Sequence, residues 1–152
     1  YVDQYLNQPE VQAALGAEVT KYEGCNDDVF ASFALTGDES KPFQGYVSEL
    51  LNKGYPVLIY AGDKDFICNW LGNHAWSNDL DWILGDSFRE EKLSPWCGGA
   101  NGEQSGEVKS FGGFTFLRVY DAGHMVPFNQ PVASLNMVNE WISGNYNFGQ
   151  TE

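Results

Sequence analysis

Apolar residues along the chain follow two patterns, a helical repeat of about 3.6 residues and short unbroken runs. From Phe43 to Leu51 the apolar side chains recur on one face of a helix and Gly54 follows them, which predicts an amphipathic helix. The run 56–61, which is followed by Gly62, is too short for a helix and too uniformly apolar for a half-exposed strand. It predicts a parallel strand that is buried on both faces.

Prolines and glycines mark the ends of two further helices. Pro9 and Gly16 bracket a short apolar pattern, which predicts a helix between them. A second helix is predicted over 131–142, because it begins at a proline and Gly144 lies beyond its end. One apolar stripe runs along this helix, and it consists of Val132, Leu135, Val138 and Ile142.

The remaining strong signal is a hairpin. Two strand-like runs, 108–111 and 114–120, flank Gly112 and Gly113, a pair that is typical of a two-residue turn. Together with the buried strand and its neighbouring helices, this order predicts an α/β fold, the tail of a doubly wound and mostly parallel sheet. The Gly-rich stretch from 97 to 106 is predicted to be a surface loop, so residues 1–152 are treated as one structural unit.

Charge narrows the classes of partner. The chain has 8 Lys and Arg against 21 Asp and Glu, a formal net charge of −13, which repels phosphate backbones and anionic lipids. We therefore expect neither a nucleic-acid nor a membrane partner, and no stretch approaches the roughly 18 apolar residues of a membrane span. Tyr1 replaces an initiator Met and no signal peptide follows it, which predicts that the chain is cut from a longer one.

The cysteines argue against a zinc site. Cys25, Cys68 and Cys97 lie far apart, without the C-x-x-C spacing that is typical of structural zinc ligands. Their odd number leaves at least one thiol free or paired outside this chain.

Candidate chemistry lies where predicted strands end, because functional groups of open α/β sheets gather at the carboxyl ends of the strands. Asp63 and Asp65 follow the run 56–61, and His124 follows the second hairpin strand, with Gly123 allowing a close turn before it. An acid and then a histidine form the second half of a Ser-Asp-His triad. The alternatives are that either aspartate only forms a turn and that His124 only caps a loop.

Two observations qualify this hypothesis. No Gly-x-Ser-x-Gly pattern occurs in the chain, so the nucleophilic serine and the oxyanion hole beside it are missing. The chain is therefore either one piece of a two-part enzyme or not a hydrolase. The second histidine, His74, lies among apolar residues in a segment that is predicted to be helical or turning, and we interpret it as structural.

Several segments resemble the serine carboxypeptidase family. The most specific are 57–69 (VLIYAGDKDFICN) and 123–127 (GHMVP), and the similarity extends from 5–7 to 137–142, nearly the whole chain. The resemblance implies the C-terminal portion of an α/β hydrolase, part of a peptidase that removes C-terminal residues at acidic pH in a vacuolar or lysosomal lumen or after secretion. It implies no metal and no organic cofactor.

The resemblance also implies individual roles. The triad acid falls on Asp65 and the histidine on His124, which leaves Asp63 as a turn former. Cys68 and Met125 fall on substrate-binding positions, where a thiol and a thioether pack against apolar side chains.

The family's cysteine that is disulfide-bonded to an N-terminal partner falls on Cys25, whereas Cys97 departs from the family pattern and its state is open. The partner is then an N-terminal chain that carries the nucleophilic serine. The isolated chain is expected to be inactive, and the expected substrates are peptides with a free C-terminus.

Two other functions fit the residue pattern alone. Another α/β hydrolase, such as an esterase, would use the same aspartate and histidine. A binding module without catalytic activity would instead stack aromatic side chains, among the 5 Trp and 8 Tyr, on a ligand such as a carbohydrate.

Overall fold

The computed structural model of the chain describes residues 1–19 and 21–148. Contacts between residues divide the chain into two compact units, Tyr1–Pro42 and a second unit that begins at Phe43. The single hydrolase domain over 1–152 stays a prediction. No helix in the described residues is long and apolar enough to cross a membrane.

The first unit is helical. The predicted helix between Pro9 and Gly16 is confirmed, with Gly16 at a left-handed φ of 65° that ends it. Asn26 caps the longest helix of the unit by accepting a hydrogen bond from the backbone N–H of Val29. The elements are α1 (Val2–Leu6), α2 (Pro9–Leu15), α3 (Asp27–Thr36) and the 3₁₀ helix η1 (Asp38–Ser40).

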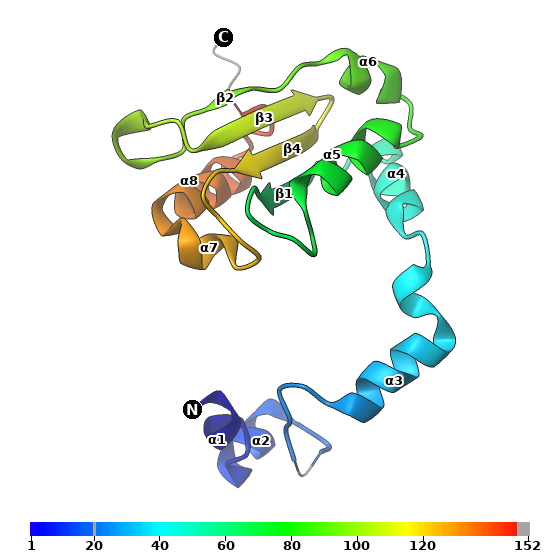
Figure 1. The fold of residues 1–152 in the computed structure, drawn as a ribbon, viewed down its shortest axis with the longest axis vertical. Coiled ribbons are helices and arrows are strands. Elements are labelled where there is room, and N and C mark those ends of the chain that lie inside the picture. Colours follow the sequence, from blue (N-terminus) through cyan, green and yellow to red (C-terminus); the bar gives the residue numbers. More distant parts are fainter. Residues whose placement is uncertain (20, 149–152) are drawn as a thin grey trace. The chain divides into compact units, whose positions relative to one another are not determined.

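The second unit is a sheet covered by helices. The strands pair in the order β1-β4-β3-β2, with β1 parallel to β4 and the other two pairs antiparallel (Figure 1). Its strands are β1 (Val57–Gly62), β2 (Ser94–Trp96), β3 (Gly106–Phe111) and β4 (Phe114–Val119). Its helices are α4 (Gln44–Asn52), α5 (Trp70–Asp79), α6 (Gly85–Glu90), η2 (Ala100–Gly102), α7 (Val126–Asn129) and α8 (Pro131–Ile142).

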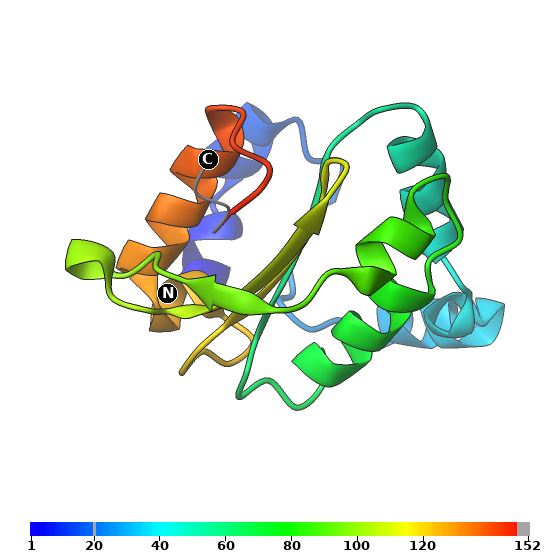
Figure 2. The same ribbon diagram turned by 90° about the horizontal axis from the view of Figure 1, so that it is seen from above.

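Helices lie on both faces of this sheet, which confirms the predicted α/β class, but within the described residues only the β1–β4 pair is parallel, because the hairpin adds β3 and β2 as antiparallel strands. Figures 1 and 2 show α8, in orange, on one face and α4 and α5, in teal and green, on the other. The sheet has a hydrophobic core on each face, and the side chains of β4 alternate between them. Phe114 and Phe116 pack on the face of α4 and α5, whereas Leu117 and Val119 pack on the face of α8.

The predicted hairpin is confirmed. Gly112 and Gly113 form its turn with φ angles of 56° and 85°, two positive values that the primed turns of hairpins require. The turn sets the register of the whole ribbon and places Glu107 directly opposite Arg118. The short strand β2 beside it, next to the predicted loop 97–106, was not predicted.

Two faces predicted from apolar runs are less buried than expected. The helix over 131–142 forms as predicted, but its stripe of Val132, Leu135, Val138 and Ile142 is exposed, and Ala133 and Met137 are buried in its place. The run 56–61 forms a parallel strand but only its end is buried, and the side chain of Tyr60 is exposed. Among the described residues, β1 pairs with a strand on one side only.

His74 is structural, as the sequence predicts. It lies on α5 with its ring 5.1 Å from that of Phe116, and its Nε2 is 3.1 Å from the side-chain nitrogen of Asn78. The side-chain oxygen of Asn78 accepts a hydrogen bond from Lys109 at 2.6 Å, so the NH₂ group of Asn78 faces His74. Because this NH₂ group donates, Nε2 of His74 accepts and carries no proton. Burial and the Lys109 charge lower the pKa of His74 below its usual value.

We predict that His74 makes the fold less stable in mild acid. As the pH falls below about 6.5, the unfolded chain binds a proton that the folded state resists, so stability is lost from there down to the lower folded pKa. The variant His74→Gln keeps a polar acceptor that does not titrate. The fall in melting temperature between pH 7 and pH 5 should therefore be smaller in this variant, and parallel curves for both proteins would contradict the prediction.

Candidate active site

The loop after β1 holds the carboxylate of Asp65 in one orientation. The Asp65 Oδ1 accepts hydrogen bonds from the backbone N–H groups of Ile67 at 3.0 Å and Cys68 at 3.1 Å. The side chain is only 7% exposed. Asp65 therefore forms the turn itself, while its second oxygen points away from these donors and stays available.

That second oxygen meets His124. The Oδ2 of Asp65 lies 2.9 Å from Nδ1 of His124, across 59 positions of sequence. A carboxylate can only accept a hydrogen bond, so Nδ1 of His124 carries the proton and the ring leaves Nε2 as its acceptor. The His124 side chain is 66% exposed, whereas Asp65 is covered, so the pair has one shielded end and one open end.

The pKa of Asp65 lies below its usual value. The hydrogen bond from His124 is the largest cause, and the N–H groups of Cys68 and Ile67 act in the same direction against the opposing effect of burial. The carboxylate therefore stays ionised at mildly acidic pH and can keep orienting the imidazole there.

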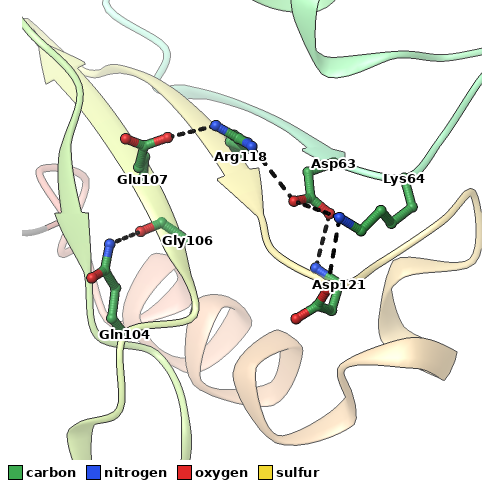
Figure 3. A network of polar contacts seen from close by, with 7 residues as sticks. All are labelled: Asp63, Lys64, Gln104, Gly106, Glu107, Arg118 and Asp121. Atoms are coloured by element: carbon green, nitrogen blue, oxygen red, sulfur yellow. Dashed lines mark hydrogen bonds and ion pairs between the residues drawn. The ribbon is translucent and has the colours of Figure 1, made fainter.

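Backbone contacts join the two loops that carry this pair. The N–H of Asp63 donates to the carbonyl of Val119 and the N–H of Lys64 to that of Ala122, both at 2.9 Å. Asp63 was expected to be a local turn former, but its side chain instead accepts from the N–H of Asp121 on the other loop at 2.8 Å (Figure 3).

The close approach of the loops depends on Gly62. A Cβ atom at this position would lie 2.2 Å from the carbonyl oxygen of Ala122. At Gly123, where the sequence predicts the need for a glycine, a Cβ would meet nothing nearer than the Asn129 side chain at 3.6 Å. The steric requirement thus lies on the aspartate loop and not beside His124.

The other predicted site residues are placed as follows. Cys68 and Met125 are exposed, and the Cys68 sulfur lies within 4.8 Å of the facing atoms of Asp65 and His124. These three side chains lie close enough together to hold a metal ion, and the expectation that no metal or cofactor takes part stays a prediction. Cys25 and Cys97 are exposed, with no disulfide among the described residues.

Sequence reasoning missed one part of the site. Arg118 lies between Glu107 and Asp63 (Figure 3), and it connects β3, β4 and the loop after β1. A signal was available, since the Gly112–Gly113 turn determines the register and puts an acidic residue directly opposite Arg118 in the hairpin. The contact of Arg118 with Asp63 has no comparable signal, because it depends on how a distant strand pairs.

Comparison with known proteins is consistent with this geometry. The family model for serine carboxypeptidases matches residues 1–144. A vacuolar serine-type carboxypeptidase of Saccharomyces cerevisiae is 64% identical over 148 residues, and carboxypeptidase Y of Komagataella phaffii is 55% identical over the same length. Each alignment covers 97% of this chain but only 29% and 28% of the relative, so the chain spans less than a third of their length.

A solved structure agrees on the fold. A prohormone-processing carboxypeptidase of Saccharomyces cerevisiae superimposes with a TM-score of 0.66 at 26% identity. The match covers 95% of this chain and 31% of that one. It confirms the predicted α/β-hydrolase fold for the described chain.

We predict that Gly62→Ala destabilises the fold, whereas Gly123→Ala does not. The first adds a methyl group against a backbone carbonyl, which should lower the free energy of unfolding by about 1–3 kcal/mol. Gly123→Ala, on the facing loop, adds a methyl group at ordinary contact distance and should change the free energy of unfolding by less than about 0.5 kcal/mol. Denaturant unfolding of both variants measures this, and equal effects would contradict the role of Gly62.

Proposed function

The chain belongs to the serine carboxypeptidase family, and we propose on this premise that it supplies the acid and the base of a Ser-Asp-His triad. The enzyme would remove single residues from the C-termini of peptides. The observation that carries the proposal is the 2.9 Å contact between Asp65 and Nδ1 of His124 at the ends of two adjacent parallel strands.

In this mechanism His124 moves the proton. Its Nε2 takes the proton of the serine hydroxyl as the serine oxygen bonds to the scissile carbonyl carbon. The imidazolium then protonates the leaving amine as the C–N bond breaks, and a water molecule repeats the sequence to release the acid and restore the serine. Asp65 holds the required tautomer and stabilises the imidazolium, as its ionised and shielded carboxylate allows.

The serine and the oxyanion hole would lie on an N-terminal part of the same enzyme. No Gly-x-Ser-x-Gly pattern occurs here, and the chain matches less than a third of its longer relatives. The free edge of β1 offers backbone groups to a further strand of that part.

An apolar groove beside β1 supports the same proposal. It has a volume of about 400 Å³ and lies between β1 and α8. Its walls include Leu58 and Tyr60 of the strand and Leu135 and Val138 of the exposed stripe. A helix of the N-terminal part that follows the added strand would cover these side chains and explain a stripe that faces outward.

Smaller observations support an acidic compartment and a disulfide linkage to the N-terminal part. The net charge of −13 and the lowered pKa of Asp65 suit an enzyme that works in an acidic lumen, and one relative is named as vacuolar. Cys25 is exposed and accessible to a disulfide with the N-terminal part. Cys68 and Met125, exposed beside the Asp65–His124 pair, would contact the substrate.

Burial disfavours an aromatic binding module that is built on tryptophan, whereas Tyr1, Tyr5, Tyr46, Tyr55 and Tyr60 are exposed. Of the 5 Trp residues, Trp82 and Trp96 are buried and the other three are half-buried in or against the two cores. Indole rings that pack in cores are not free to stack on a glycan.

We predict that Asp65→Asn and His124→Ala each lower kcat of the full enzyme by on the order of 10⁴-fold. Asp65→Asn places a neutral amide opposite Nδ1 of His124, and this amide no longer stabilises the imidazolium. His124→Ala removes the base. Asp86→Asn is the matched control, because this carboxylate is 96% exposed and pairs only with Arg89. Hydrolysis of a peptide with a free C-terminus measures the effect. Activity that survives His124→Ala, or an enzyme that cleaves esters but never peptides, would contradict the proposal.

A second prediction concerns the partner. In native material, a heavier species should release this chain on reduction, because the linkage through Cys25 is a disulfide. A serine-directed fluorophosphonate should label the released partner and not this chain. Intact mass under non-reducing and reducing conditions, with and without the label, gives the answer. A label on this chain would place the nucleophile here and overturn the division of the triad.

A further inference from the structure

We propose that Asp63 and Arg118 form a positioning pair that sets the distance between Asp65 and His124. This inference rests on the proposed function, since it assigns a role to two residues that do not touch the reacting atoms. They contact each other beside the Asp65 loop, and Arg118 also contacts Trp70 at the start of α5.

Asp63 joins the two active-site loops through its side chain. Its Oδ1 accepts the backbone N–H of Asp121 at 2.8 Å, and the side chain is 7% exposed. Asp63 stands two residues before Asp65, and Asp121 three residues before His124. The bond therefore fixes one loop against the other within a few residues of both catalytic side chains.

The loop of Asp121 has a conformation that benefits from such a constraint. Asp121 has a φ of 52°, a left-handed value that among residues with a side chain is adopted mainly by asparagine and aspartate. Its own carboxylate is exposed and lies 3.8 Å from Lys64, so the 2.8 Å bond from its backbone N–H to Asp63 is the shorter of its two contacts.

Arg118 contacts the loop that carries Asp65 at both of its ends. One guanidinium nitrogen is 3.5 Å from Oδ2 of Asp63 at the beginning of the loop (Figure 3). The guanidinium also lies 4.0 Å from the ring centre of Trp70, the first residue of α5, where the loop ends. Asp65 lies between these two anchors, so its position depends on both.

Arg118 is itself fixed from the far side. Its second terminal nitrogen is 2.9 Å from a carboxylate oxygen of Glu107 on β3, and its guanidinium lies 5.0 Å from the ring of Tyr120. Two carboxylates and two aromatic rings thus surround a planar cation whose five donors have a fixed geometry. The positive charge of Arg118, together with that of Lys64 at 3.6 Å, also compensates the negative charge of Asp63 near Asp65.

The test compares Asp63→Ala and Asp63→Asn in the full enzyme, with Asp86→Asn as control. Asp63→Ala removes the bond between the loops and should lower kcat about 10–100-fold with KM within about twofold, because a misplacement of about 1 Å can cost about 100-fold in rate. Asp63→Asn keeps an acceptor for Asp121 but turns an NH₂ group toward Arg118, and the smaller displacement should lower kcat about three- to tenfold. Asp86→Asn should match the wild type.

Two readouts separate positioning from mere folding. Titration with a fluorophosphonate counts competent sites, so kcat is taken per labelled serine. A downfield proton resonance of the His124 Nδ1–H reports its bond to Asp65 and should weaken or shift in Asp63→Ala. If this variant loses only labelled sites while kcat per site stays at the wild-type value, the role is structural and the proposal is overturned.

Other outcomes are equally decisive. If Asp63→Ala does not fold, Asp63→Asn decides, and an unchanged kcat in it overturns the proposal. Wild-type kinetics in both Asp63 variants, with His124→Ala inactive, removes the positioning role and leaves the proposed function intact. Full activity in His124→Ala removes the proposed function itself.

Discussion

The parallel pairing of β1 with β4 is the constraint on which the rest of the site depends. It aligns Gly62 with Val119, so that both strands end at the same level and their loops leave the sheet side by side. Residues 59 positions apart then meet through a hydrogen bond that no local structure could form. Because Gly62 has no side chain, the backbone of the first loop lies directly against the carbonyl of Ala122 and carries the carboxylate to the imidazole.

The sequence predicted most elements whose ends are marked by a proline or a glycine. The helix over 131–142 and the Gly112–Gly113 turn follow from proline, glycine and apolar spacing, and the ends of the strands predicted where the aspartate and the histidine stand. The role of Asp63 was not predictable in this way, because its partner on the β4 loop is 58 positions away and a neighbouring aspartate, Asp65, forms the turn. A sequence pattern identifies a strand end but not which side chain reaches across it.

The outward-facing stripe of α8 explains why hydrophobic patterning misjudged burial. Spacing reports that a helix has an apolar face, but not which chain will cover that face. Leu135 and Val138 line a groove with Tyr60 of β1, while Ala133 and Met137 complete the core of the described unit. A helix with apolar residues on two sides is what a layer between a sheet and further protein requires, and the relatives of this family are more than three times as long as the chain.

The hairpin turn has a consequence for how this region tolerates insertions. Gly112 and Gly113 lie at the opposite end of β4 from the histidine loop, yet they determine which face of the sheet each residue of that strand occupies. One extra residue inserted into β4 beyond the turn would move Arg118 to the α8 side, since side chains alternate. An insertion in β4 would thus separate Arg118 from Asp63 and Glu107 without changing any of these three residues.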